Sequence, residues 1–330
     1  MVNSFIASSI LHFFQHFKNY FYCMMQKFSL LSLLLLASLC IFGQKDTTIK
    51  VNENYITLSE IVVNNKLDVP SFIERVKNDT TFYKAFRNLR IIGYTALNDI
   101  KMLDKKGNIE ASLHSKTKQI RTGNCRKMEV LNQAITGDMF DFEGNFNYYT
   151  AQMYASLFFT KDSVCGENNI VKGHEFSTNG LSGMEKHKEQ LKMLFFNPGK
   201  KIDGLPFISN KTAIFDESMA DKYDMAIDFS EQDSVPCYVF KIKVKPDKKN
   251  DVVIDEMTTW FNAKNFEIVA RNYSLSYDAG VYDFDVDMHV EMTKVGQLLV
   301  PSVLRYNGNW KAVFKKRERG IFTATLFDFQ

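Results

Sequence analysis

The chain has 330 residues and lacks both an excess of one charge and the short motifs of the common enzyme classes. Its 41 basic and 38 acidic residues leave a net charge of +3, too balanced to indicate a nucleic-acid partner or an anionic membrane surface. No Gly-x-Ser-x-Gly, His-Glu-x-x-His or phosphate-binding loop occurs. No nucleophile–base pair or metal-ligand set stands at recognisable spacing. We therefore expect a non-enzymatic protein with no catalytic residues, metal site or cofactor.

Cysteine is also scarce. Beyond the first 43 residues only Cys125, Cys165 and Cys237 remain. An odd number excludes a complete disulfide framework but permits one bridge in an oxidising compartment. Three separate buried thiols are an equally open alternative, because an unpaired cysteine behaves as a small hydrophobic side chain.

Long hydrophobic runs are absent except at residues 30–41. That run has about a dozen residues, fewer than the ~20 that a membrane-spanning helix needs, and it follows a short basic segment. We therefore expect residues 1–43 to be an N-terminal extension and a cleaved signal peptide. The exported chain would begin near Gln44 and be periplasmic or associated with the outer membrane. A longer membrane anchor and lipidation at Cys40 are the alternatives.

The most regular stretch is residues 282–292, where apolar and polar side chains alternate without a break. This period of two predicts a β-strand with one buried and one solvated face, and residues 278–280 predict a hairpin turn before it. The polar face could bind a hard cation, although a solvated outer face is the simpler interpretation. The apolar series is Tyr282, Phe284, Val286, Met288, Val290 and Met292; the polar series is Asp283, Asp285, Asp287, His289 and Glu291.

The rest of the chain predicts an α+β fold in one domain, residues 69–330. A lead-in, residues 44–68, contains a strand at 56–63 that pairs with a sheet edge or serves as a tether. Helices are expected near residues 71–76, 80–86, 146–159 and 184–194, the last two within a helical insertion at about 145–200. From residue 235 onward we expect about seven strands, with one turn at 307–309. The predicted architecture is a curved antiparallel meander sheet, an incomplete β-barrel, packed on a few helices.

Aromatic residues make up 14% of the chain, with 29 Phe and 14 Tyr, which favours β-structure and large apolar surfaces. We expect an apolar cleft between the sheet and the helices that binds a hydrophobic molecule. The alternative is that the same side chains form an ordinary solid core. The predicted lining is Phe240, Trp260, Phe284, Met288 and Phe314 from strands, and Tyr149, Met153 and Leu157 from a helix.

Three local patterns in residues 235–310 carry a family resemblance: WFNAK at 260–264, IVAR at 268–271 and VPS at 300–302. With helices first and a meander behind a signal peptide, the chain resembles the periplasmic lipoprotein-carrier and outer-membrane lipoprotein-sorting superfamily. That resemblance implies helices covered by a curved, incomplete barrel, with lipid held in an apolar cavity. The segment 58–63 also resembles a junction in uncharacterised secreted envelope proteins of Bacteroidota-type bacteria.

The expected function is therefore carrier-like binding of a lipid or a lipoprotein acyl chain in the cell envelope. One alternative is an envelope scaffold that binds a protein partner through an edge of its sheet. The other is an outer-membrane β-barrel, since the strands alternate and the chain nearly ends in the aromatic residues Phe327 and Phe329. The sequence leaves the oligomeric state open.

Overall fold

The computed structural model describes residues 46–171, 193–202, 208–278, 282–312 and 316–330. The chain divides into two units, residues 1–45 and residues 46–330. The predicted signal peptide falls in the first unit, outside the described residues, and the fold below is that of the second.

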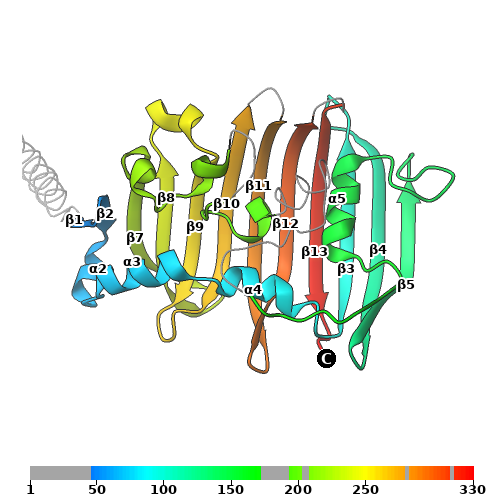
Figure 1. Cartoon of the computed structure of the whole chain (residues 1–330), viewed down its shortest axis with the longest axis horizontal. Coiled ribbons are helices and arrows are strands. Elements are labelled where there is room, and N and C mark those ends of the chain that lie inside the picture. The colour runs from blue at the N-terminus through cyan, green and yellow to red at the C-terminus, as the bar shows by residue number, and fades with distance from the viewer. Residues whose placement is uncertain (1–45, 172–192, 203–207, 279–281, 313–315) are drawn as a thin grey trace, which may run out of the picture. The chain divides into compact units, whose positions relative to one another are not determined.

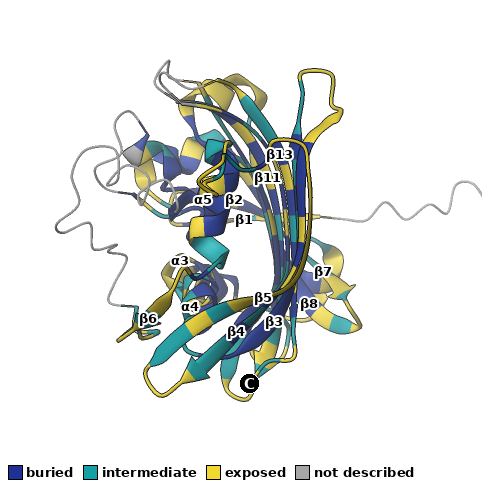
Figure 2. Cartoon of the chain, turned by 90° about the vertical axis from the view of Figure 1, so that its right-hand side faces the viewer, coloured by how far each residue is buried: buried dark blue, intermediate teal, exposed yellow. Residues whose placement is uncertain are grey.

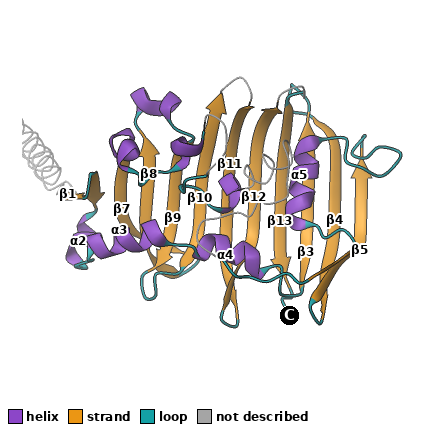
Figure 3. Ribbon diagram, viewed as in Figure 1, coloured by secondary structure: helices purple, strands orange, loops and turns teal. Residues whose placement is uncertain are grey.

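The described chain forms one open sheet of thirteen strands in the order β1-β2-β7-β8-β9-β10-β11-β12-β13-β3-β4-β5-β6 (Figures 1 and 3). All neighbouring strands are antiparallel except β2 and β7. The sheet is strongly curved, with helices on its concave side (Figure 2), which confirms the predicted fold class. The strands are β1 Thr47–Val51, β2 Asn54–Leu58, β3 Tyr94–Leu103, β4 Ile109–Thr122, β5 Cys125–Thr136, β6 Ser163–Cys165, β7 Tyr223–Gln232, β8 Val235–Val244, β9 Ile254–Asn262, β10 Ile268–Asp278, β11 Tyr282–Val295, β12 Leu298–Ala312 and β13 Glu318–Phe327.

Two meanders build this sheet. Strands β7 to β13 follow one another in space as in sequence, and β3 to β6 form the second series. The last strand, β13, joins them by pairing with β3 from Thr95↔Phe327 to Leu103↔Arg319. Segments more than 200 residues apart therefore share one continuous concave face.

The predicted face assignment of β11 is confirmed. Phe284, Val286 and Val290 are at most 2% exposed, while Asp285 and Asp287 are exposed. The hairpin is confirmed as well, because β10 and β11 pair in register from Asp278↔Asp283 to Ala270↔Glu291. The apolar series of β11 is therefore the centre of the concave face.

Strand β12 corrects the prediction of a turn at residues 307–309. It continues through Gly308, which pairs with Val286 of β11 and with Gly320 of β13. A Cβ on Gly308 would collide with the ring of Tyr306, and one on Gly320 would come within 2.8 Å of the Phe322 ring. Glycine is present here because two aromatic rings lie flat across the strands, so it does not mark a turn.

The helices are α2 Glu60–Asn64, α3 Val69–Asn78, α4 Thr81–Asn88 and α5 Tyr149–Phe158. Helix α3 confirms the helix expected near residues 71–76. Its buried residue Phe72 packs edge-on against Phe240 and Phe261 of the sheet. Its N-cap is Asp68, whose carboxylate accepts the Ser71 N–H. No helix among the described residues is long and apolar enough to span a membrane.

Other expected elements differ from the structure in length or type. The strand predicted at 56–63 ends at Leu58, and Glu60–Asn64 is helical, because Ser59 takes the N-cap position and only Val62 of that helix is buried. Strands β5 and β7 were not expected. The sequence of β5 carries little apolar alternation, whereas that of β7 alternates at Tyr223, Met225 and Ile227 and its signal was overlooked. The helix predicted at 184–194 lies mostly outside the described residues. Three short 3₁₀ helices cover Ser209–Thr212, Glu217–Lys222 and Pro246–Asp251.

The cysteine alternatives are resolved. Cys125 of β5 and Cys165 of β6 form a disulfide, while Cys237 is a buried free thiol. The bridge closes a segment of 40 residues that includes α5.

The faces of β11 predict opposite outcomes for two neighbouring substitutions. Phe284→Asp should lower the free energy of unfolding by about 4 kcal/mol or more, because it removes a buried ring and leaves a carboxylate without a partner. Asp285→Asn, on the solvated face, should change it by less than about 0.5 kcal/mol. Urea denaturation followed by circular dichroism measures both. Equal losses would show that the faces are assigned wrongly.

Candidate functional site

An apolar cavity lies between α5 and the concave face of the sheet. Its volume is about 30 Å³, room for little more than one water molecule and far below the roughly 300–1,000 Å³ of small-molecule sites. The lining atoms are apolar throughout. The lining residues are Thr150, Met153, Tyr154, Leu157, Phe158, Phe195, Phe196, Met288, Leu304, Tyr306 and Phe322.

The floor of the cavity depends on the glycine pair. Because Gly308 and Gly320 face each other, the rings of Tyr306 and Phe322 lie flat and stack with centroids 4.8 Å apart and planes 11° apart. Bulkier residues at the two glycine positions would lift these rings toward the helix. The flattened rings therefore leave space between sheet and helix that a normally packed sheet would fill.

The roof is α5, and a strand holds its first turn. The Glu318 carboxylate of β13 accepts the Tyr149 N–H at 2.9 Å, the Thr150 N–H at 2.7 Å and the Thr150 hydroxyl at 2.6 Å. The helix has no side-chain cap of its own, so Glu318 satisfies its free N–H groups and its positive dipole end. Further along, Tyr154 contacts Phe322 at 4.9 Å between ring centroids.

Two adjacent phenylalanines form a wall. The Phe195 carbonyl accepts a 2.5 Å hydrogen bond from the buried Tyr273 hydroxyl, and the Phe195 ring lies 6.0 Å from that of Tyr306. The Phe196 ring packs at 4.5 Å against Phe86 of α4. Both residues line the cavity.

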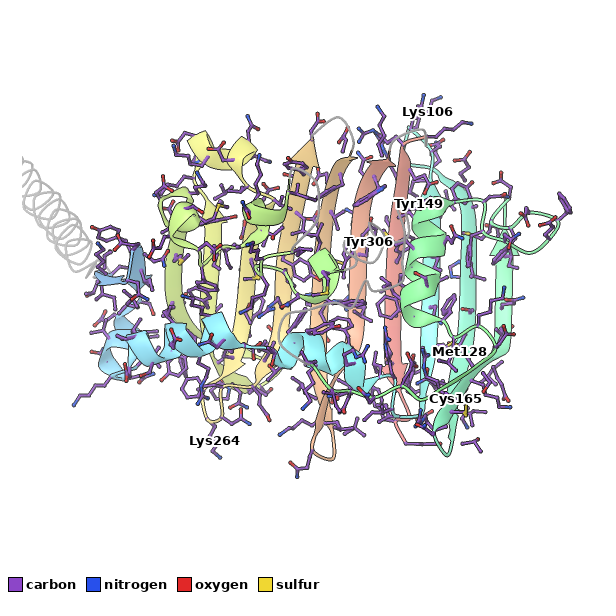
Figure 4. The ribbon with its side chains drawn as sticks, viewed as in Figure 1. Lys106, Met128, Tyr149, Cys165, Lys264 and Tyr306 are labelled. Atoms are coloured by element: carbon purple, nitrogen blue, oxygen red, sulfur yellow. A yellow bond between two sulfur atoms is a disulfide. The ribbon has the colours of Figure 1, made fainter. Side chains whose placement is uncertain are left out.

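The structure brings together Met153, Leu157 and Met288 of the predicted lining in this cavity. Tyr149 begins the helix above it (Figure 4), and Phe314 lies outside the described residues. Phe240 and Phe284 share the concave face but pack elsewhere, Phe240 against Phe72 and Phe284 in a 4.9 Å stack on Trp310.

Trp260 does not share the face of Phe240. It pairs with Val239, whereas Phe240 pairs with Thr259, so consecutive positions place the two rings on opposite faces. The signal was available in the sequence. Met257, Thr259 and Phe261 alternate as buried positions in the second half of β9, and Trp260 falls between the last two.

A second cavity of about 30 Å³ adjoins the first and differs from it in charge. The two share Leu157, Phe158 and Phe196 as a common wall. The second is also lined by Arg87 of α4, Arg90 just beyond that helix and Arg126 of β5. Sequence reasoning missed this cluster because Arg126 is far from Arg87 and Arg90 in the chain. Only the pairing of β5 with β4 places Arg126 near α4.

One carboxylate bridges two of the three arginines. Glu167 accepts hydrogen bonds from Arg90 Nη1 at 3.0 Å and from Arg126 Nε at 2.5 Å. Burial acts to raise the pKa of Glu167, but the Arg126 hydrogen bond and the neighbouring guanidinium charges outweigh it and hold the pKa below its ordinary value. Burial, reinforced by the charge of Arg87, lowers the pKa of Arg90.

The acidic series of β11 faces outward and pairs with neighbouring strands. Asp283 binds Arg317, Asp287 accepts the Ser274 hydroxyl at 2.6 Å, and Glu291 lies 3.3 Å from Arg305. Across the part of the chain that the structure describes, no three His, Cys, Asp or Glu side chains gather to hold a metal ion. Cross-strand pairing accounts for this face.

The Glu318 contact predicts a local loss of order over the cavity. Glu318→Gln should lower the free energy of unfolding by about 1–2 kcal/mol, because a charged acceptor at a helix N-terminus becomes neutral. Amide hydrogen exchange in residues 149–158 should accelerate more than elsewhere. Glu256→Gln, on the exposed face of β9, is the matched control and should change neither measurement. Unchanged exchange in α5 would contradict the role given to Glu318.

Comparison with known proteins yields little beyond this geometry. No protein-family model matches the sequence, and no curated protein matches it. A solved DUF1329 family protein from Desulfovibrio piger is similar over 76% of this chain and 93% of its own, with 11% identity and a TM-score of 0.24. A Vibrio parahaemolyticus domain, provisionally assigned as an outer membrane lipoprotein-sorting protein, is similar over 78% and 88%, with 7% identity and a TM-score of 0.25. Likenesses of this size carry no argument about function, and the superfamily resemblance stays a prediction.

Proposed function

We propose that the protein is a non-enzymatic binder of a hydrophobic ligand, an acyl chain or a lipid, taken up between α5 and the concave face of the sheet. The observation that carries the proposal is the wholly apolar cavity beneath α5, lined by methionine, leucine and aromatic side chains. Such a lining offers dispersion contacts and no hydrogen bond, which matches an alkyl chain and few other ligands.

The volume of the cavity sets a condition on this function. At about 30 Å³ it is closed to an acyl chain, so binding requires α5 or the Phe195–Phe196 wall to move. Burial of an alkyl chain gains ~0.8 kcal/mol per methylene, so twelve methylenes gain roughly 10 kcal/mol against an association cost of roughly 4–15 kcal/mol. Long chains are therefore favoured over short ones. Met153 and Met288 suit such exchange because the unbranched thioether repacks easily.

The proposed setting is the cell envelope. The Cys125–Cys165 disulfide supports it, because structural disulfides persist in oxidising compartments and are rare in reducing ones. The hydrophobic run at residues 30–41, which the sequence predicts to be part of a signal peptide, supports the same setting.

Ligand uptake is tested with a matched pair of methionine variants. Met288→Ala enlarges the cavity and should shift the preferred fatty-acid length upward by about two carbons, besides losing roughly 2–4 kcal/mol of stability. Met225→Ala, buried in β7 outside the cavity, should lose similar stability and leave the length preference unchanged. Displacement of a fluorescent fatty acid by a chain-length series measures the preference. If the protein does not bind the fluorescent fatty acid and native mass spectrometry detects no co-purified lipid, the proposed function is wrong.

A second candidate function has its own observation. Strand β5 pairs with β6 only at residues 125–127, so in the described chain the rest of its outer edge has no strand partner. Val130, Leu131 and Ile135 of this edge strand are between 43% and 58% exposed. An edge of this kind accepts an extended segment of a partner protein as an added strand.

Charged substitutions at the edge test this candidate. Val130→Lys together with Ile135→Lys should abolish capture of an envelope protein in a pull-down, because inserted lysines oppose strand addition. Lysines at two half-buried positions of the convex face, Thr258 and Ser274, are the control. If the edge variant captures the same partners as the control, strand addition at β5 is excluded.

A further inference from the structure

We propose that the arginine cavity receives the anionic head of the ligand, a carboxylate or a phosphate, and that Glu167 occupies this position in the unliganded protein. The inference rests on the proposed function and adds the chemical class of the ligand: a single-chain anionic amphiphile. Its tail would lie in the apolar cavity beneath α5 and its head among Arg87, Arg90 and Arg126.

The first argument is the balance of charge. Arg121 of β4 lies directly opposite Arg126 of β5, and its guanidinium donates to the Arg90 carbonyl at 3.3 Å, so four guanidinium groups gather at this end of the sheet. Among the described residues, Glu167 is the one carboxylate paired with any of them. Like charges directly opposite each other in a sheet, such as Arg121 and Arg126, are destabilising. A second anion bound beside them would reduce this repulsion.

The second argument is the donors that Glu167 leaves unused. Arg87 donates through Nη2 to the Asn168 carbonyl at 2.9 Å, yet its buried Nε has no hydrogen-bond partner among the described residues. A buried donor without an acceptor loses its hydration without compensation. A ligand head with two or three acceptor oxygens can engage Arg87 as well as the two arginines that Glu167 bridges, and guanidinium groups suit such bidentate contacts.

The third argument is the arrangement of the two cavities. They share Leu157, Phe158 and Phe196, so a side-chain movement at this wall joins an apolar slot to a cationic end. Tyr306 and Tyr149 mark the apolar end in Figure 4, and Met128 and Cys165 mark the cationic end. The apolar cavity and the cationic cavity therefore follow each other along α5 in the same way as the tail and the head of an anionic amphiphile.

The fourth argument is that Glu167 lies in an irregular segment, so that its side chain can move while the residues on either side stay fixed. It follows Cys165, which the disulfide fixes to β5, and precedes Asn169, whose amide donates to Asn88 Oδ1 at 2.8 Å. The arginines belong to or adjoin α4, β4 and β5 of the packed fold, whereas Glu167 lies in an irregular stretch after β6. A ligand head can displace the carboxylate into water while the arginines keep their positions.

The test uses three ligands with the same twelve-carbon tail: dodecanoate, dodecyl phosphate and dodecanol, each below its micellar concentration. Displacement of a fluorescent fatty acid from the full exported chain gives each affinity. Wild type should bind an anionic ligand at least about tenfold more tightly than dodecanol, the size expected of charge-assisted hydrogen bonds. Whichever anion binds more tightly identifies the head as a carboxylate or a phosphate.

Variants assign the preference to this cavity. Arg90→Gln and Arg126→Gln should each reduce the preference for the anion over dodecanol to less than about threefold. Glu167→Gln should raise the affinity for the anion by roughly threefold to tenfold and leave the affinity for dodecanol unchanged. A gain of affinity cannot arise from damage to the fold. Arg319→Gln, in β13 on the convex face, is the control. If an arginine variant fails to fold, Arg90→Lys and Glu167→Gln decide the question.

The outcomes separate this inference from the function on which it rests. If none of the three ligands binds, the proposed function fails and the inference fails with it. If all three bind with equal affinity, or if the Glu167 and arginine variants keep the wild-type preference, the protein binds alkyl chains but the arginine cavity is not the head site.

Discussion

The concave face of a strongly curved sheet must be covered, and this requirement arranges the rest of the molecule. Each strand from β8 to β13 places large apolar side chains on that face, and leaving them in contact with water would cost free energy. Helix α3 covers it through Phe72 against Phe261, α4 through Phe82 against Tyr273, and α5 through Tyr154 against Phe322. The described cavities with apolar walls lie where α5 and the Phe195–Phe196 segment complete this cover.

Elements with a strong local pattern were predictable from the sequence. The alternation in β11 has a period of two over eleven residues, which no other regular structure accommodates. The four-residue spacing of Phe82 and Phe86 predicted a helix, and their rings meet in α4 with centroids 5.4 Å apart. The general position of the site followed as well, because Met153, Leu157 and Met288 each lie on the apolar face of a predictable element.

Features that depend on contacts distant in sequence could not be predicted. Arg87, Arg126 and Glu167 come from α4, β5 and the stretch after β6, and each is unremarkable in its own surroundings. Gly308 was misinterpreted because a glycine between two asparagines is the usual sign of a turn. Only the structure shows that its missing side chain makes room for Tyr306. Local patterns fix which face a residue belongs to, while pairing between distant strands decides which residues share a site.

The pairing of β13 with β3 has a consequence for how the chain is made. Strands β3 to β5 are synthesised early, and β3 keeps a bare row of backbone donors and acceptors until β13, more than 200 residues later in the sequence, covers it. Contacts of such long sequence separation form slowly, and an uncovered strand invites pairing with another chain in the meantime. A chaperone that holds the nascent N-terminal half would protect it during this interval, and a chain truncated before β13 would leave the edge of β3 permanently open to aggregation.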